Sequence, residues 1–345
     1  MCNMKNEINR SGITAALVIL LVFFRLFAAG QHSIVERYGH LSVKGNYLLS
    51  EKGDTVQLRG MSFFWSQWMP QFYNGDCVKW LKDDWKCTIV RAAMGVEKGG
   101  YLTNPEEEKE TIQKVVDAAI AQGLYVIIDY HSHEAHTNPD AAVMFFAEMA
   151  KKYGAYPNVI YELYNEPLAD PSWSKDLKPY AEKVLKEIRK HDSDNLVIMG
   201  TRQWSQKVSE VIADPIEDPN IAYALHFYAH THRQWLMDEA RKAMENGLAL
   251  FVSEMGTCDA SGNKFFNPKE TQKWFDFMDQ YKLSWCNWSL CDKEETASAL
   301  KPGASATGNW KVEDLTESGI LIRNELILKN TPLLKAPVLK AGTKK

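Results

Sequence analysis

Eight short apolar runs, rich in β-branched residues, recur along this chain, and longer amphipathic stretches separate them. Near-continuous apolar strands that alternate with helices are typical of parallel strands buried on both faces. Eight strand–helix units predict an α/β fold, a (β/α)8 TIM barrel. The runs cover residues 56–60, 88–92, 125–130, 159–163, 196–199, 222–225, 250–253 and 284–288.

The segments around these runs predict one domain over residues 31–328. A short hairpin over 41–43 and 47–49 is expected to cover the bottom of the barrel, and a helix over 315–328 is expected to close it. An α/β barrel of this length routinely forms a single unit, so a second domain is not required. The helical patterns between strands cover 106–122, 141–152, 177–190, 234–245 and 269–281.

The N-terminus has the pattern of an export signal. Lys5 and Arg10 precede an apolar run over 13–24, and Ala28-Ala29-Gly30 offers small residues for cleavage. The run is shorter than the roughly 20 apolar residues that span a bilayer. We therefore expect residues 1–30 to be a cleaved signal peptide, with an uncleaved anchor as the alternative. The mature protein is then secreted, extracellular and free of the membrane.

Charge excludes some partners. The formal net charge is -4, and residues 1–30 are net basic, so the mature chain is more acidic. It therefore has no overall positive field that would attract nucleic acid. Residues 329–345 are predicted to be a disordered basic tail, a surface-binding tag being the alternative. That tail has no acidic residue and holds five lysines, Lys329, Lys335, Lys340, Lys344 and Lys345.

Cysteine spacing leaves two interpretations open. Five cysteines remain after the signal, an odd number, so at least one thiol is unpaired within the chain. None has the C-x-x-C spacing of a metal site. They are either small buried hydrophobic residues or partners in disulfides, and Cys77–Cys87 is the first pair to test.

Polar and aromatic residues gather where the predicted strands end. In a barrel of this kind the carboxyl ends of all strands meet at one face, where functional residues collect. Two of these residues, Glu166 and Glu254, are the carboxylate pair that cleavage of a glycosidic bond needs: one protonated donor and one ionised nucleophile. Aromatic faces suit the apolar C–H faces of a sugar. The strand-end residues are Arg91, His131, Asn165, Glu166, His226, Tyr228, Glu254 and Trp288.

Together these motifs resemble glycoside hydrolase family 5 (cellulase family A), and within it the bacterial-type endo-β-1,4-glucanase subfamily. The resemblance runs from about residue 39 to about residue 328, which makes residues 31–328 a catalytic domain. The motifs that carry it are Leu58-Arg59-Gly60-Met61-Ser62, Val90-Arg91-Ala92-Ala93-Met94, Asn165-Glu166-Pro167, His226-Phe227-Tyr228, Val252-Ser253-Glu254-Met255-Gly256, and Asn287-Trp288-Ser289-Leu290 through Lys293.

The resemblance implies a role for each catalytic residue. Glu166 is implied as the general acid/base and Glu254 as the nucleophile. Asn165 would hydrogen-bond the sugar 2-hydroxyl, and Arg91 and Tyr228 would hold Glu254 ionised and aimed, because a cation and a donor favour the charged form.

It also implies how the substrate is held. His226 would lie near Glu166 and set its protonation, while His131 would contact the sugar in the cleavage subsite. Trp288 would form the floor under that sugar. The other implied binding residues are Trp68 and Trp204 as platforms on either side, and Lys293 and Glu295 on the non-reducing side.

A retaining double displacement is the expected mechanism. It requires the two carboxyl groups to lie roughly 5–5.5 Å apart, against roughly 6.5–9.5 Å in an inverting enzyme. It also requires the two groups to titrate apart, and we expect the carboxylate neighbour to raise the pKa of Glu166. One departure stands out: relatives often carry a His after the first strand, whereas Ser62-Phe63-Phe64-Trp65 has none. An aromatic side chain is expected to replace that polar contact.

Three alternatives compete with an endo-β-1,4-glucanase. The first is a metal-dependent barrel hydrolase, prompted by His131-Ser132-His133 and His230-Thr231-His232, although no H-E-x-x-H spacing is present. The second is a non-catalytic β-glucan-binding barrel. The third is the same chemistry on mannan, xylan or mixed-linkage glucan. No cofactor or metal is implied; the expected partner is β-1,4-glucan, and the protein is expected to be a monomer.

Overall fold

The computed structural model describes residues 33–335, and within them eight parallel strands close into a barrel. The strands follow one another around the barrel in chain order, with β10 paired to β3. This confirms the predicted TIM barrel. The predicted signal peptide and the last ten residues lie outside the described residues. The strands are β3 (Arg59–Phe63), β4 (Ile89–Gly95), β5 (Tyr125–His131), β6 (Val159–Glu162), β7 (Val197–Met199), β8 (Ile221–Tyr228), β9 (Leu250–Gly256) and β10 (Trp285–Leu290).

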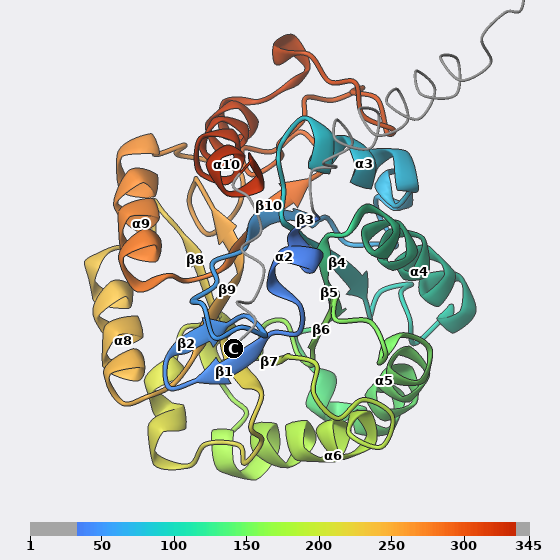
Figure 1. Cartoon of the computed structure of the whole chain (residues 1–345), viewed down its shortest axis with the longest axis vertical. Coiled ribbons are helices and arrows are strands. Elements are labelled where there is room, and N and C mark those ends of the chain that lie inside the picture. Colours follow the sequence, from blue (N-terminus) through green and yellow to red (C-terminus); the bar gives the residue numbers. More distant parts are fainter. Residues whose placement is uncertain (1–32, 336–345) are drawn as a thin grey trace, which may run out of the picture. The chain divides into compact units, whose positions relative to one another are not determined.

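Helices surround the barrel as a ring (Figure 1). Their starts follow the sequence: proline occupies the first turn of α4, α5 and α9, where its missing N–H costs nothing. Asn267 caps α9 by accepting the Glu270 N–H at 3.1 Å. The helices are α2 (Ile34–Tyr38), α3 (Gly75–Asp83), α4 (Pro105–Gln122), α5 (Pro139–Tyr153), α6 (Lys178–Ile188), α7 (Arg202–Ser205), α8 (Gln234–Glu245), α9 (Pro268–Tyr281) and α10 (Glu317–Lys335).

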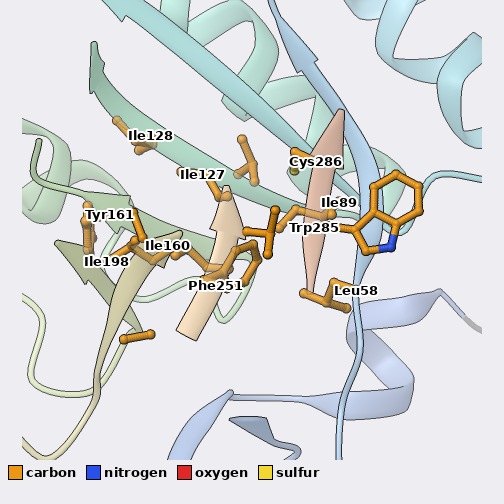
Figure 2. Packing of buried hydrophobic residues seen from close by; sticks show 14 of the residues in the cluster. Leu58, Ile89, Ile127, Ile128, Ile160, Tyr161, Ile198, Phe251, Trp285 and Cys286 are labelled. Carbon is orange, nitrogen blue, oxygen red and sulfur yellow. The ribbon is translucent and has the colours of Figure 1, made fainter. Parts of the chain in front are cut away.

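Both faces of the strands are buried, as near-continuous apolar runs require. Ile127 and Ile128 are neighbours in β5, so their side chains point to opposite faces, and both are fully buried (Figure 2). On the outer face, Trp285 stacks on Phe275 of α9 with 5.6 Å between ring centroids. Packing on both sides holds the strand ends in fixed positions, and the functional side chains are carried on those ends.

The hairpin of β1 (Ser42–Lys44) and β2 (Tyr47–Leu49) lies at the N-terminal end of the barrel. Asn220, which precedes β8, donates to the Leu41 carbonyl at 2.8 Å and accepts the Val43 N–H at 2.9 Å. Figure 1 views the barrel with this hairpin in front of the strands. The predicted cover of the barrel bottom is confirmed, and the C-terminal end of the strands lies at the other end of the barrel.

The first barrel strand begins later than the sequence predicts. Residues 56–58 of the predicted run are buried, but parallel pairing starts only at Arg59 and continues to Phe63. Before it, the Val56 N–H bonds the Leu48 carbonyl of the hairpin, and the Leu58 N–H bonds the Ser284 hydroxyl. An apolar run predicts that its residues are buried, and here the residues before Arg59 are buried although they do not pair with a barrel strand.

The closing helix α10 extends past its predicted end at residue 328, to Lys335. Lys329 pairs with Asp279 at 2.5 Å, and the Asn330 amide donates to the Lys86 carbonyl at 2.8 Å. These contacts anchor residues that composition alone assigns to a basic tail, so residues 329–335 belong to the helix. Across residues 33–335, no helix combines the length and apolar character needed to cross a bilayer.

The five cysteines of the described chain are all buried free thiols. A Cys77–Cys87 disulfide is therefore not formed, and the interpretation as small buried hydrophobic residues is confirmed. Burial raises the pKa of both thiols above the ordinary value, which disfavours the reactive thiolate.

We predict that Asn220→Ala destabilises the protein by about 1–3 kcal/mol, because it leaves the Leu41 carbonyl and Val43 N–H without their partner. Urea denaturation measures the change. Asn246→Ala is the matched control: Asn246 is exposed, and its side-chain amide donates to the Lys242 carbonyl one turn back. Its effect should stay within about 0.5 kcal/mol. Equal stability of both variants would show that the hairpin contact contributes nothing.

Candidate active site

The C-terminal ends of six strands bring the predicted catalytic residues together. Arg91 lies in β4, His131 ends β5, and Asn165 and Glu166 follow β6. The remaining predicted strand-end residues are His226 and Tyr228 in β8, Glu254 in β9 and Trp288 in β10.

The fully buried guanidinium of Arg91 connects this group. Its Nη1 donates to Glu254 Oε2 at 3.2 Å, and its Nη2 donates to Asn165 Oδ1 at 2.7 Å. Nε donates to Glu162 Oε2 at 2.7 Å, and Nη2 also lies 2.9 Å from Asp129 Oδ2. A planar guanidinium with carboxyl groups on three sides fixes their directions as well as their charge.

Glu254 is aimed by two donors. Besides the Arg91 contact, Tyr228 donates its phenol O–H to Glu254 Oε1 at 2.8 Å. Burial raises the pKa of Glu254, and the neighbouring Glu166 raises it further, although His226, Arg91 and Tyr228 act in the opposite direction. The orientation predicted for Glu254 is present in the structure. The ionising effect predicted for Arg91 and Tyr228 is also present, but it does not outweigh burial and Glu166, and the pKa of Glu254 stays above its ordinary value.

Glu166 contacts histidine instead of arginine. Its Oε1 lies 3.0 Å from His226 Nδ1, and its Oε2 lies 3.8 Å from His133 Nδ1. Burial alone would raise the pKa of Glu166, but the hydrogen bond and positive charge of His226 outweigh it and lower the pKa. The prediction that the carboxylate neighbour raises the pKa of Glu166 is therefore wrong for the free protein. The sequence shows the neighbouring carboxylate, but not that His226 Nδ1 faces Glu166.

His226 is the second buried cation of the site. Its Nε2 lies 2.9 Å from Ser253 Oγ, and that hydroxyl donates a hydrogen bond to Glu162 Oε1. Burial opposes charge, but Glu162, Glu166 and Glu254 outweigh it and raise the pKa of His226 to about 9. By contrast, burial and Arg91 lower the pKa of His131 well below its ordinary value, so that imidazole is neutral.

The two glutamates face each other closely. One carboxyl oxygen of Glu166, one of Glu254 and one ring nitrogen of His226 lie within 4.8 Å of one another. This closeness of one oxygen from each carboxyl group favours the roughly 5–5.5 Å carboxyl separation of retaining glycosidases over the roughly 6.5–9.5 Å of inverting ones.

Two cavities meet at this pair. One, of about 460 Å³, lies on the Trp204 side and is also lined by Gln206, His226, His232 and Ala260. The other, of about 310 Å³, lies on the Trp288 side. Glu166 and Tyr228 line both, so the cleft continues past the carboxyl pair in two directions. The second cavity is lined by aromatic, acidic and basic side chains, which include Phe64, Trp65, Trp68, His131, His133, Glu254, Trp288, Lys293 and Glu295.

Aromatic rings form the wall of the second cavity. Trp288 stacks parallel to His131, with 5.0 Å between ring centroids and 3° between planes. Phe64 packs on Trp288 at 5.3 Å, and the edge of Trp65 meets His131 at 4.2 Å and 87°. After β3 the chain thus presents two aromatic side chains, Phe64 and Trp65, where an aromatic residue is expected from the sequence.

The predicted platform and rim residues also line the cleft. Trp68 and Trp204 are 45% and 41% exposed, one at each end. Trp204 is held in left-handed backbone geometry (φ 57°), and its N–H bonds the Pro167 carbonyl at 2.9 Å. Lys293 and Glu295 form an ion pair at the edge of the second cavity. An exposed indole carried on a fixed backbone is suited to stacking on a sugar ring.

Sequence reasoning missed three polar residues beneath the site: Asp129, Glu162 and Ser253. All three are fully buried, and each contacts Arg91 or His226. A signal was present, because Asp129 and Glu162 interrupt otherwise apolar strand runs. A charged residue inside a buried strand needs a partner of opposite charge.

The histidines of the metal-hydrolase alternative have other partners. His131 Nδ1 contacts Asp129 at 2.6 Å, and His232 Nδ1 accepts the Tyr228 N–H at 2.8 Å. Within residues 33–335, the one cluster with metal-ligand spacing is Glu166, His226 and Glu254. Both ring nitrogens of His226 are engaged there, by Glu166 and Ser253, so the cluster fits proton transfer better than metal ligation.

Paired carboxyl groups in an aromatic cleft, at the C-terminal end of a (β/α)8 barrel, define a glycoside hydrolase. The family model described as Cellulase (glycosyl hydrolase family 5) matches residues 49–294. The chain belongs to glycosyl hydrolase family 5.

Similar proteins agree with this assignment. An endoglucanase of Clostridium saccharobutylicum is 46% identical over 296 residues, covering 85% of this chain and 66% of that protein's length. A solved structure from Cytophaga hutchinsonii is 63% identical, with a TM-score of 0.87, covering 88% of this chain and 99% of that one. A variant catalytic domain of Thermobifida fusca endoglucanase Cel5A, in complex with cellotetraose, is 36% identical with a TM-score of 0.82. That match covers 86% of this chain and 99% of the domain.

We predict that the protein loses stability as the pH rises from 6.5 to 8. In that window His226 keeps its proton in the native state, with a pKa of about 9, whereas an unfolded His loses it near 6.5. The stabilisation is complete below pH 6.5 and is lost as the pH rises through 9. One proton over this window corresponds to about 2 kcal/mol. Urea denaturation at each pH measures the free energy of unfolding, and an NMR titration of the His226 imidazole measures its pKa. Titration of His226 near pH 6.5 would contradict the prediction.

Proposed function

We propose that this protein is a secreted endo-β-1,4-glucanase that hydrolyses internal bonds of β-1,4-glucan with retention of configuration. The observation that carries the proposal is the close carboxyl pair, Glu166 and Glu254, at the junction of two cavities. Similarity to an endoglucanase, and to a domain solved with cellotetraose, supports β-1,4-glucan as the substrate.

The shape of the cleft supports cutting within a chain. Glu166 and Tyr228 line both cavities, so sugar units can lie on both sides of the bond that is cleaved. Trp204 offers a platform on the side of the leaving group, and Trp68 offers one on the other side. A site closed at one end would favour release of terminal units.

In the first step, Glu254 attacks the anomeric carbon while Glu166 protonates the leaving oxygen. In the free protein the proton is shared over the 3.0 Å between His226 Nδ1 and Glu166 Oε1. A charged His226 beside an ionised Glu166 holds the same number of protons as a neutral His226 beside a protonated Glu166. As the glycosidic bond breaks, that proton moves through Glu166 to the leaving hydroxyl, and Glu254 forms an ester with the sugar.

In the second step, Glu166 acts as the base. It takes a proton from water, the hydroxide attacks the anomeric carbon, and Glu254 leaves as a carboxylate. The proton on Glu166 is again shared with His226, which restores the starting state. Arg91 and Tyr228 stabilise the charge that returns to Glu254.

The remaining residues hold the sugar. Trp288 offers an aromatic face beneath the ring in the cleavage subsite, where His131 stacks against it. Asn165 is oriented by Arg91, which binds its Oδ1 and leaves its amide N–H groups for the 2-hydroxyl. Lys293 and Glu295 offer a donor and an acceptor to the next sugar. The chain is proposed to work as an extracellular monomer.

We predict that Glu254→Gln and Glu166→Gln both abolish the loss of viscosity of carboxymethylcellulose. Loss of general acid catalysis should cost about 10²–10⁴ in rate, and loss of the nucleophile at least as much. Viscometry and reducing-sugar assays measure the change. Glu245→Gln, at an exposed position on α8, is the matched control and should retain activity. If the unchanged protein does not hydrolyse carboxymethylcellulose, assays on mannan, xylan and mixed-linkage glucan identify the polymer that it hydrolyses.

We further predict that the first product released has the β-configuration. Two displacements at the same carbon restore the original configuration, and the closeness of Glu166 and Glu254 supports that route. Proton NMR of cellotetraose hydrolysis, recorded before mutarotation, distinguishes the anomers. Initial release of the α-anomer would exclude the glycosyl-enzyme intermediate.

A further inference from the structure

A continuous chain of hydrogen bonds runs beneath the cleft from one glutamate of the pair to the other. Glu166 contacts His226 Nδ1, and His226 Nε2 contacts the Ser253 hydroxyl at 2.9 Å. Ser253 donates to Glu162 Oε1, and Glu162 Oε2 accepts from Arg91 Nε at 2.7 Å. Arg91 Nη1 completes the chain at Glu254, 3.2 Å away.

The directions of these bonds are fixed by which groups can donate. Burial alone would raise the pKa of Glu162, but Arg91 and His226 outweigh it and lower the pKa, so Glu162 is a carboxylate that accepts the Arg91 Nε–H. A carboxylate accepts only, so the proton of the Ser253 hydroxyl points at Glu162. A hydroxyl has one proton, and Ser253 has therefore none left for His226. The contact between His226 Nε2 and Ser253 can form only if Nε2 carries a proton.

We propose that Ser253 and Glu162 are positioning residues that keep a proton on His226 Nε2, so that the proton at Nδ1 is the one that Glu166 uses. This proposal rests on the proposed glycosidase function of the site. If Nε2 could lose its proton, a neutral His226 would keep a proton on Nδ1. It would then donate to an ionised Glu166 that has nothing to give to the leaving oxygen.

Burial protects these hydrogen bonds from exchange with water. Ser253 and Glu162 are fully buried, and His226 is 1% exposed, so water does not compete for these bonds. Glu162 Oε1 also lies 3.7 Å from His226 Nε2, which adds a favourable charge on the same side of the ring. A similar requirement for one histidine tautomer operates when a buried carboxylate orients a catalytic imidazole.

Glu162→Gln tests which groups donate in this row of hydrogen bonds, because glutamine has nearly the same size and shape as glutamate. Arg91 can only donate, so the glutamine oxygen must face Arg91, and the NH₂ group must face Ser253. The Ser253 hydroxyl then accepts from the glutamine and is free to donate to His226 Nε2. The variant should therefore move the proton of a neutral His226 from Nε2 to Nδ1.

The rate test compares two substrates. Cellotetraose needs a proton on its leaving oxygen, whereas 2,4-dinitrophenyl β-cellobioside releases a phenolate that is stable without one. For Glu162→Gln we expect kcat/KM on cellotetraose to fall at least about tenfold more than kcat/KM on the aryl cellobioside. Ser253→Ala should shift the ratio in the same direction, and Ser253→Thr, which keeps the hydroxyl, should restore it.

Asp129→Asn is the matched control. Asp129 is also a buried carboxyl partner of Arg91, at 2.9 Å, but it has no bond to Ser253 or His226. Any loss in this variant should be equal on the two substrates. Equal losses on both substrates in Glu162→Gln would overturn the proposal, because they would show a general loss of structure or of nucleophile charge.

A measurement without substrate separates this proposal from the function it rests on. Nitrogen-15 NMR of the histidine rings, with the His226 signals assigned by their loss in His226→Asn, reports which ring nitrogen carries a proton. We expect a protonated Nε2 in the unchanged protein and an unprotonated Nε2 in Glu162→Gln. An unprotonated Nε2 in the unchanged protein overturns the proposal whether or not the protein hydrolyses glucan.

Discussion

The buried guanidinium of Arg91 is the interaction on which the site depends. Removing a cation from water costs several kcal/mol unless carboxyl groups and hydrogen-bond acceptors replace the solvent. Here the replacements come from β5, β6, the segment after β6, and β9. Arg91 thus ties together strands that are far apart in the sequence. It also aims Glu254 and Asn165 through two of its own nitrogens.

A second consequence is that the two glutamates of the pair differ in their surroundings. Glu254 contacts a permanent cation and a phenol, whereas Glu166 contacts His226, a cation that can give up its proton. A nucleophile needs a fixed charge, and an acid/base needs a partner that exchanges a proton. The buried bonds through Ser253 and Glu162 connect the two environments, so neither glutamate can be described without the other.

The fold could be predicted to the level of elements because each signal was local. Eight apolar runs predicted eight strands, and the amphipathic stretches between them predicted α4, α5, α6, α8 and α9. The errors came where distant contacts decide. β3 begins at Arg59 because preceding residues pair with the hairpin and Ser284, and α10 continues to Lys335 because Lys329 finds Asp279. Composition carries no information about such partners.

The sequence by itself determined the barrel, the strand-end position of the catalytic residues, and the chemistry those residue types allow. Periodicity and residue type are properties of the chain, and the ends of parallel strands must converge. Only the tertiary structure decided which atoms face one another. It placed His226 against Glu166 and so lowered a pKa that sequence reasoning expected to be raised. The reason is physical: pKa values and hydrogen-bond direction depend on contacts of about 3 Å between residues far apart in sequence.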